Sequence, residues 1–297
     1  MRHRVADLDG PVHYLDFGGT GPPVLMVHGL AGSAINWMAV GPEIAKTHRA
    51  IAIDLAGFGE TPLRNRSAAI GANTALVHDF IREVVREPVT LIGNSMGGHI
   101  SILEAAEHPR WITAMVLVDP AIPGAPVSRP EPALLAVIAA LSVPGLAMTL
   151  LQRESRVVGP EGLVARVFSL VAADPSRLDP AVVEAHLQLT RERARLGRQN
   201  GRALVQATRS IGLRIADPRF WAKVAAVQCP TLVIHGSLDR VIPVAAAREL
   251  ARRRTDWDLV VLKDVGHVPM LETPGLFMRT LRAWSAYKSP AAPAAAS

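Results

Sequence analysis

VTLIGNSMG, residues 89–97, places one serine between two glycines directly after an apolar run rich in β-branched residues. The run predicts a buried strand, and the residues from Gly97 onward change to a helical pattern. Ser95 therefore stands on a turn between a strand and a helix. Such a turn is sterically tight, so the positions two before and two after the serine must be small, and the turn holds the hydroxyl clear of the sheet. The helix that follows offers N–H groups to a negatively charged oxygen.

Strands and helices alternate along the rest of the chain, which predicts an α/β fold with a mostly parallel sheet and helices on both faces. Asp9-Gly10 predicts the turn of a hairpin near the N-terminus. Apolar runs that predict strands occupy residues 24–27, 51–53, 89–92, 115–118, 231–234 and 259–262. Helical patterns occupy residues 35–45, 68–85, 96–107, 244–254 and 275–286.

One connection, from Asp119 to Pro218, is far longer than a crossover between parallel strands needs. It predicts an inserted helical cap over residues 123–217. The core of the fold would then consist of residues 1–122 and 218–288. The last residues, 289–297, are rich in Ala and Pro and are expected to be disordered.

Composition and charge indicate which classes of binding partner the protein can have. The chain is 49% hydrophobic and 20% charged, which is typical of a globular protein, and its single cysteine excludes an internal disulfide framework. The formal charge is +6, and arginines concentrate between Arg191 and Arg219, with no aromatic residue among them for stacking on bases. We therefore expect a solvated helical face and no nucleic-acid partner; an anionic surface or lipid partner is the alternative.

The stretch from Ala133 to Leu151 is uncharged and almost wholly apolar, but Pro144-Gly145 interrupts it. A pair of apolar helices covering a pocket is favoured over a membrane span, with peripheral membrane contact as the alternative. The N-terminus lacks the apolar core of a signal peptide, so a cytoplasmic location is expected. The oligomeric state cannot be predicted.

Ligands of an open parallel sheet bind where loops leave the carboxyl ends of the strands. The loop after residue 234 carries Asp239, and the loop after residue 262 carries His267. The loop after Val27 is a glycine-rich turn, residues 28–33. Asp119 also follows a strand directly, so it is the alternative acid.

At these residues the chain resembles the α/β-hydrolase family, and specifically its cap-bearing branch of esterases, epoxide hydrolases, dehalogenases and carbon–carbon bond hydrolases. The resemblance covers about residues 10 to 287. It rests on motifs in family order, and the order Ser, Asp, His is that of the family's triad. The motifs are His28-Gly29, residues 54–59 (DLAGFG), residues 93–97, His235-Gly236 with Asp239, and Gly266-His267. The resemblance implies an eight-stranded, mostly parallel sheet with an inserted helical cap.

The chemistry assigns a role to each residue. The hydroxyl of Ser95 is too weakly acidic to attack at neutral pH, so it needs an adjacent base, for which His267 is placed. Asp239 would orient the imidazole and stabilise the imidazolium. The backbone N–H groups of Leu30 and Met96 would bind the oxyanion. Residues that could line the pocket are Gly29, Trp37, Phe58 and Val268, with core packing the alternative for Trp37 and Phe58.

Neither metal-ligand spacing of histidines nor a phosphate-binding lysine is evident, so no metal and no other cofactor is expected. Epoxide hydrolases and haloalkane dehalogenases of the family use an aspartate nucleophile, which disfavours both activities here. The prediction is a serine hydrolase that cleaves an ester, lactone or thioester of a fairly hydrophobic small molecule. A carbon–carbon bond hydrolase of vinylogous diketo acids is the alternative, and a non-catalytic ligand receptor on the same fold is a third hypothesis.

Overall fold

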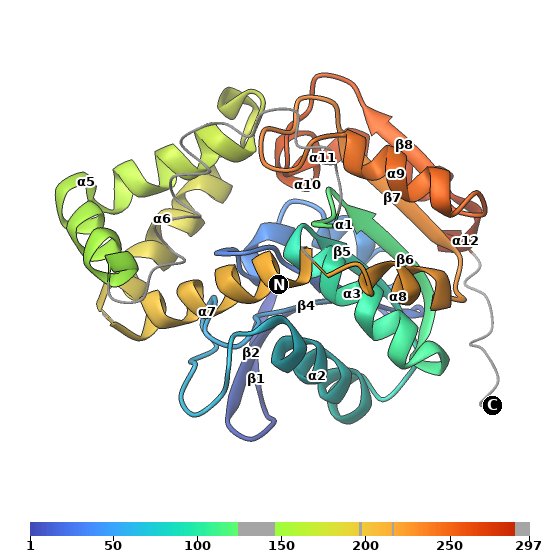
Figure 1. Ribbon diagram of the computed structural model, residues 1–297, viewed down its shortest axis with the longest axis horizontal. Coiled ribbons are helices and arrows are strands. Elements are labelled where there is room, and N and C mark those ends of the chain that lie inside the picture. The colour runs from blue at the N-terminus through green and yellow to red at the C-terminus, as the bar shows by residue number, and fades with distance from the viewer. Residues whose placement is uncertain (124–145, 196–197, 216, 289–297) are drawn as a thin grey trace.

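The computed structural model describes residues 1–123, 146–195, 198–215 and 217–288 (Figure 1). Most of the apolar stretch 133–151 and the whole of the C-terminal tail 289–297 lie outside these residues. The predicted limits of the cap, residues 123 and 217, each lie beside a residue that the structure does not describe. The division into core and cap therefore stays a prediction.

Within the described residues, eight strands form one sheet in the order β1-β2-β4-β3-β5-β6-β7-β8. Only β1 and β2 pair antiparallel with their neighbours, and the other pairs are parallel. The predicted α/β fold with a mostly parallel sheet is confirmed. The strands are β1 (Arg2–Asp7), β2 (Pro11–Gly18), β3 (Pro23–Val27), β4 (Arg49–Ile53), β5 (Val89–Asn94), β6 (Ile112–Val118), β7 (Thr231–Gly236) and β8 (Asp258–Leu262).

The helices between the strands follow the predicted pattern with three differences. The segment 275–286 is divided at Trp284, whose backbone is extended, into the helices Pro274–Ala283 and Ser285–Lys288. The segment 35–45 is not one helix: a 3-10 turn is followed by a new helix that begins at Gly41-Pro42, where proline favours a helix start. The segment 68–85 begins at Ile70 and ends in a π-helical turn. The core helices are η1 (Ala34–Trp37), α1 (Gly41–Ile44), α2 (Ile70–Phe80), η2 (Ile81–Val85), α3 (Met96–Glu107), η3 (Pro109–Trp111), α8 (Phe220–Ala226), α9 (Ala245–Arg253), α10 (Pro269–Glu272), α11 (Pro274–Ala283) and α12 (Ser285–Lys288).

Two hydrophobic clusters cover the two faces of the sheet. Alternate residues of β3 divide between them: Leu25 and Val27 face the cluster that includes α2, α3 and α8, whereas Val24 and Met26 face the cluster that includes α1 and α11. This alternation is what a strand covered on both faces requires. The central strands are fully buried, so they form a rigid platform for the loops at their carboxyl ends.

Between β6 and α8, the described residues form three long helices, α5 (Leu146–Val171), α6 (Pro180–Arg195) and α7 (Arg198–Ile215), with the short η4 (Pro175–Arg177). Figure 1 shows them gathered beside the sheet rather than within its helical layers. Gly159, with a φ of 70°, interrupts α5, and Pro160 follows it. In the part of the chain that the structure describes, no helix is both long and apolar enough to cross a membrane.

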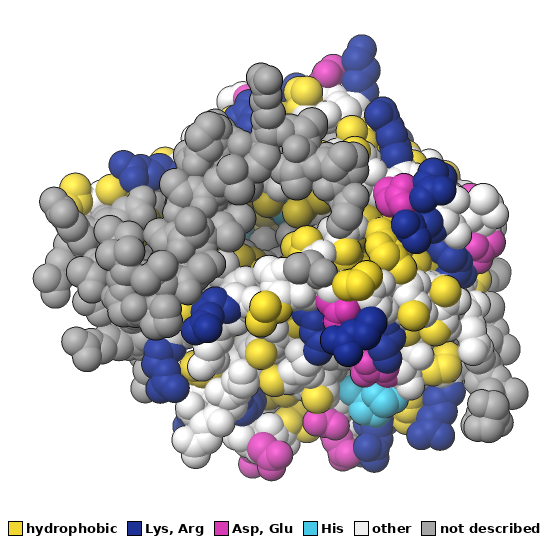
Figure 2. All heavy atoms as spheres, in the orientation of Figure 1, with side chains coloured by type: hydrophobic (Ala, Val, Ile, Leu, Met, Phe, Trp, Pro, Cys, Tyr) yellow, Lys and Arg dark blue, Asp and Glu magenta, His cyan; other side chains and the backbone are white. Residues whose placement is uncertain are grey.

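The arginine-rich stretch is only partly a solvated face. Arg202, Arg209 and Arg214 are exposed, as expected. Arg193 differs, because its guanidinium donates hydrogen bonds of 2.7 and 2.6 Å to the carbonyls of Gly57 and Gly59. Arg193 thus attaches α6 to the loop after β4. On the face shown in Figure 2, basic and acidic side chains lie next to one another among hydrophobic ones.

Candidate active site

Ser95 occupies the strained turn that its sequence predicts. Its φ and ψ are 54° and −115°, outside the regions that residues with a side chain favour, and α3 begins at the next residue. A Cβ at Gly93 would lie 2.4 Å from the carbonyl of Gly97, and a Cβ at Gly97 would lie 2.3 Å from the carbonyl of Val27. Both positions therefore require glycine. The Ser95 backbone is held by hydrogen bonds to Val118 and from Ala121.

The turn after β3 lies against the serine. A Cβ on Gly29 would lie 3.1 Å from the Cβ of Ser95, so this position also requires a small residue. The N–H groups of Leu30 and Met96 donate no hydrogen bond within the described residues, and Met96 is the first residue of α3. Free N–H groups in such positions can bind an anion. These are the two groups that the sequence assigns to an oxyanion hole.

His28 shapes this turn and is fully buried. Its Nδ1–H donates to the carbonyl of Gly29 at 2.7 Å, and its Nε2 accepts from the N–H of Leu55 at 3.1 Å. Burial lowers the pKa of His28, and the nearby Arg193 lowers it further, against the opposing effects of Asp54 and of Gly29. Both ring nitrogens of a neutral imidazole are therefore occupied, and the ring is not available for proton transfer.

His267 and Asp239 form a buried pair. The Nδ1 of His267 lies 2.7 Å from the Oδ2 of Asp239, while the Oδ1 of Asp239 accepts from the N–H groups of Val241 and Ile242. Burial raises the pKa of Asp239, but the charge and hydrogen bond of His267 outweigh it, so the pKa lies below its ordinary value. Asp239 is thus a carboxylate that fixes the Nδ1–H tautomer of His267 and leaves Nε2 as the basic nitrogen.

Asn94 connects this pair to the turn of Ser95. Its side-chain N–H group donates to the carbonyl of His267 at 3.1 Å and to the carbonyl of Val118 at 3.2 Å. The histidine loop is therefore attached to the residue directly before the serine. No hydrogen bond joins Ser95 Oγ to His267 within the described residues, and this contact commonly tightens only when substrate binds.

Asp119, the alternative acid, lies behind the pair rather than on His267. It is fully buried in a left-handed conformation with a φ of 47°, and its Oδ1 accepts from the N–H of Gly236 at 2.8 Å. Burial raises the pKa of Asp119 well above its ordinary value, and the charge of Asp239 raises it further. Two adjacent buried carboxyls cannot both ionise cheaply, so a proton is held more tightly on Asp119 than on Asp239.

His235 lies between these two acids. Its Nε2 is 3.6 Å from the Oδ1 of Asp119 and 3.5 Å from the Oδ2 of Asp239, and it donates to the carbonyl of Ile242 at 2.9 Å. Burial lowers the pKa of His235 despite the opposing charge of Asp239. A neutral His235 therefore packs behind the acid and braces the loop that carries it.

Glu272 joins the histidine loop to the end of α5. Its carboxyl oxygens accept from the N–H groups of Gly266, Ala173 and Asp174 at 2.8, 3.0 and 3.1 Å, and from Arg177. The N–H of His267 donates to the carbonyl of Val171 at 2.6 Å, in the last turn of α5. The segment after α5 therefore lies directly on the loop of the candidate base.

The four predicted pocket residues, Gly29 included, are all buried, and the other three belong to two hydrophobic clusters. Trp37 and Val268 belong to one, and Phe58 belongs to the other, where its ring meets that of His28 edge to face at 5.8 Å. Asn36, beside Trp37, lies 3.4 Å from the Nε2 of His186 on α6. The 3-10 turn η1 therefore contacts a helix of the predicted cap.

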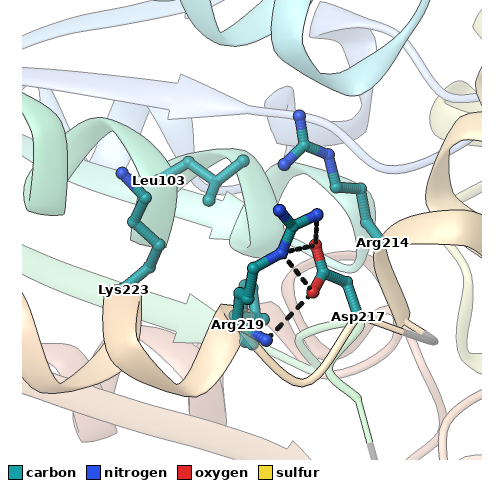
Figure 3. Close-up of a pocket in the computed structure, with 6 residues that line it drawn as sticks. Leu103, Arg214, Asp217, Arg219 and Lys223 are labelled. Carbon is teal, nitrogen blue, oxygen red and sulfur yellow. Dashed lines mark hydrogen bonds and ion pairs between the residues drawn. The ribbon is translucent and has the colours of Figure 1, made fainter.

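A surface pocket between α3, α7 and α8 contains none of the three residues of the predicted triad (Figure 3). Arg219 turns toward Asp217 there, with a contact of 2.9 Å between guanidinium and carboxylate. Arg219 is therefore paired within the pocket, and we assign no chemistry to the pocket. The pocket is lined by Leu103, Arg214, Asp217, Arg219, Phe220 and Lys223.

Three supporting residues are not evident from the sequence. Glu272 and Asn94 act through backbone contacts to distant loops, and His235 acts through packing, so none has a spacing signal of its own. His235 does stand in the His235-Gly236 motif, which is a hint that the motif has a structural purpose.

Comparison with known proteins identifies the family of the chain. The family model described as "Alpha/beta hydrolase family" matches residues 24–280. The chain is 28% identical over 269 residues to a 2-hydroxy-6-oxo-6-(2'-aminophenyl)hexa-2,4-dienoic acid hydrolase of Metapseudomonas resinovorans, covering 88% of this chain and 82% of that protein. It is 26% identical over 260 residues to Lipase 1 of Psychrobacter immobilis, covering 85% and 73% of the two chains.

Among solved structures, a membrane phospholipase A described as a bacterial virulence factor superposes with a TM-score of 0.77 at 25% identity, over 97% of this chain and 87% of that one. The family match spans most of the chain, from the third strand to the last long helix, and includes every residue of the predicted triad. The chain therefore belongs to the alpha/beta hydrolase family.

Proposed function

We propose that the protein is a serine hydrolase that cleaves a carboxylic ester of a fairly hydrophobic small molecule. One observation carries the proposal: a serine in a strained turn at the start of α3 is attached through Asn94 to a histidine whose Nδ1 lies 2.7 Å from a buried carboxylate. A packing role alone would explain neither the strain nor the buried charge.

In the proposed mechanism, Nε2 of His267 takes the proton of Ser95 as the serine oxygen attacks the ester carbonyl. Asp239 keeps the ring in its tautomer and stabilises the imidazolium that forms. The imidazolium then gives its proton to the leaving alkoxide, so an alcohol departs and an acyl-serine remains. Water, deprotonated by the same histidine, releases the acid and restores Ser95.

The oxyanion of each tetrahedral intermediate would lie against the N–H groups of Leu30 and Met96. The positive end of α3 points to the same place, because Met96 is its first residue. Each such donor contributes about 3 kcal/mol to the transition state in comparable sites. This mechanism needs no metal at the serine.

A hydrophobic acyl group is proposed because the candidate lining is apolar. Trp37, Phe58 and Val268 are all buried in hydrophobic clusters near the loops of the site. The similarity to Lipase 1, at 26% identity, supports an ester substrate. The proposed substrate is therefore a small hydrophobic ester. The proposed location of the protein is the cytoplasm.

Turnover tests the ester proposal. Purified protein is incubated with aryl and alkyl esters of increasing acyl length, and Ser95→Ala serves as the matched variant. We expect hydrolysis that favours medium or long acyl chains and is lost in Ser95→Ala. Equal turnover by the variant would contradict the proposal.

Carbon–carbon bond hydrolysis is the second candidate, favoured by the 28% identity to the dienoic acid hydrolase of Metapseudomonas resinovorans. Such a substrate carries a carboxylate that a cation would bind. Arg191 on α6 is one such cation, and in the structure it pairs with Glu161 at 2.7 Å. Turnover of a chromogenic diketo acid, compared with turnover of the ester panel, decides between carbon–carbon bond hydrolysis and ester hydrolysis. Turnover of the diketo acid alone would make carbon–carbon bond hydrolysis the first candidate.

A further inference from the structure

Two histidines and a glutamate converge at the edge of the sheet where the chain begins, far along the strand order from His267. The Nδ1 of His3 lies 3.0 Å from the Nε2 of His13 and 3.1 Å from the Oε1 of Glu60, and the last two atoms are 3.5 Å apart. Val5 of β1 lies opposite His13 of β2, so His3, two residues before Val5, is a diagonal neighbour of His13 on the same face of the sheet. The hairpin therefore brings together histidines that lie ten residues apart.

Asp54 fixes the protonation pattern of this cluster. Its Oδ2 lies 2.6 Å from the Nδ1 of His13, and a carboxylate can only accept there, so His13 carries its proton on Nδ1. The lone pair of Nε2 then points toward His3 and Glu60. A carboxylate behind a histidine in this way is the usual support of a metal-binding imidazole, because it fixes the tautomer and raises the basicity of the ligand.

Backbone groups hold the carboxylate of Asp54 in place. Its Oδ2 also accepts from the N–H of Glu60 at 2.8 Å, and its Oδ1 accepts from the N–H of Ala34 at 2.6 Å. A Cβ on Gly59 would lie 2.0 Å from the Asp54 carboxyl, so only glycine lets the loop wrap this close. His13 and Asp54 are buried, whereas His3 and Glu60 are about half exposed. The cluster thus has a rigid inner side and an open outer side.

The spacing of the three atoms matches a metal coordination sphere. Donor atoms of a tetrahedral zinc site with bonds of about 2.0 Å lie roughly 3.3 Å apart, close to the separations of 3.0, 3.1 and 3.5 Å seen here. Two imidazoles and one carboxylate are ligands that suit Zn²⁺. The exposed side leaves room for water as the fourth ligand.

We propose that His3, His13 and Glu60 bind a divalent transition-metal ion, with Zn²⁺ as the best chemical fit, and that Asp54 supports the site from behind. The ion would join β1 and β2 to the loop after β4. That loop also accepts the hydrogen bonds of Arg193 from α6, and Asp54 holds the start of η1. The site is therefore structural, and it is independent of whether Ser95 is catalytic.

A second group, His78, Glu104 and His108, is a poorer site. The rings of His78 and His108 stack at 3.6 Å with an angle of 23°, which places their faces, not their nitrogen lone pairs, against one another. It nevertheless offers a matched control. Variants of this group change a histidine without touching the proposed ligands.

Zinc titration of the untagged full-length protein by calorimetry tests the proposal, with cobalt absorption spectra to report the coordination geometry. We expect one Zn²⁺ per chain and a tetrahedral cobalt spectrum. His3→Ala and Glu60→Ala should each raise the Kd at least about tenfold, in keeping with the cost of losing support around a metal. His108→Ala should leave both readouts unchanged.

The side chains of His3 and Glu60 are about half exposed, so we expect both variants to fold. Circular dichroism of each variant checks the fold. An absence of zinc binding, or binding with the same Kd in the His3→Ala/Glu60→Ala double variant, would overturn the proposal. Loss of binding in His108→Ala alone would assign the metal to the other group and would overturn it as well.

Discussion

Two histidine–carboxylate pairs of nearly equal geometry lie toward opposite edges of one sheet. His267 pairs with Asp239 at 2.7 Å after β8 and β7, and His13 pairs with Asp54 at 2.6 Å beside β2 and β4. Both carboxylates are buried, and both hold the histidine proton on Nδ1. What differs is the surroundings of each histidine. The loop of His267 is attached through Asn94 to the strained serine turn, whereas the Nε2 of His13 faces polar atoms of His3 and Glu60.

This difference teaches that a histidine–aspartate pair does not by itself specify catalysis. Asp239 has a second buried acid, Asp119, behind it, so the pair sits in a closed electrostatic network. The pair of His13 and Asp54 instead lies beside the half-exposed side chains of His3 and Glu60. A closed network suits proton transfer, and an open cluster of lone pairs suits a cation.

Removal of the serine should have the largest effect and should affect one edge only. Ser95→Ala is expected to lower kcat for a turned-over ester by about 10⁴-fold or more, because the nucleophile is lost. Zinc affinity should not change. Ser101→Ala, which alters a buried serine of the same helix that bonds to Gly97, is the control and should keep most activity. Similar losses in both variants would indicate a folding defect instead.

The two acids behind His267 should differ in importance. Asp239→Asn is expected to lower kcat/KM by about 10²- to 10⁴-fold, since the asparagine side chain favours the wrong tautomer. Asp119→Asn should cost less than about tenfold, because Asp119 accepts a hydrogen bond from the backbone of Gly236, whereas Asp239 is the acid paired with His267. Steady-state kinetics on one ester compares them. A larger loss for Asp119→Asn would identify it as the acid.

Glu272 should matter through position. Glu272→Gln replaces an acceptor of several N–H groups with a side chain that also donates, and is expected to destabilise the fold by about 2 kcal/mol. Denaturant unfolding measures this, with the exposed Glu87→Gln as control. Because His267 remains, we expect kcat to fall by less than about tenfold and KM to rise. An unchanged stability would contradict the role of Glu272 in joining the two loops.

The open edge should respond to metal and to pH without changing catalysis. Zinc at 100 times its Kd is expected to raise the Tm by about 5 °C, and a chelator should reverse this with ester turnover unaffected. A loss of turnover on chelation would contradict the separation of the two edges.

The sign of the pH effect follows from His13, which faces His3, Asp54 and Glu60. Burial lowers the pKa of His13, but the hydrogen bond and charge of Asp54 and the charge of Glu60 outweigh it, so the folded pKa is raised. Without metal, the pair stabilises the fold below the ordinary pKa of about 6.5, and this is lost as the pH rises through the raised value. Protons compete with zinc, so the zinc-induced Tm shift should be larger at pH 8 than at pH 6, as thermal unfolding can measure. A larger shift at pH 6 would contradict the assignment of His13 as a ligand.

Local chemistry explains what the sequence could predict. The strands, the turn at Ser95 and the loops of Asp239 and His267 follow from β-branched runs and glycine positions that act over a few residues. The family order of the motifs supplied the rest of the candidate triad. The split of the segment 35–45 was not predicted, because the helical pattern continues across a proline that in fact starts a new helix.

Long-range contacts explain what the sequence could not predict. Glu272 meets Ala173 and Gly266, Asn94 meets His267, and His3 meets Glu60, and each pair is joined only by the fold. No metal was expected because the histidine spacing along the chain matches no helical or loop motif. The register of β1 on β2 creates the proximity, and a register is not visible in a spacing.

The reactivity of Ser95 is the central claim. Treatment with a fluorophosphonate, followed by mass spectrometry of the digested protein, tests it directly. We predict one covalent adduct, located on Ser95, that is absent from Ser95→Ala and slowed in Asp239→Asn. An unmodified wild-type protein, or equal labelling of Ser95→Ala, would contradict the account and leave the fold as that of a ligand receptor.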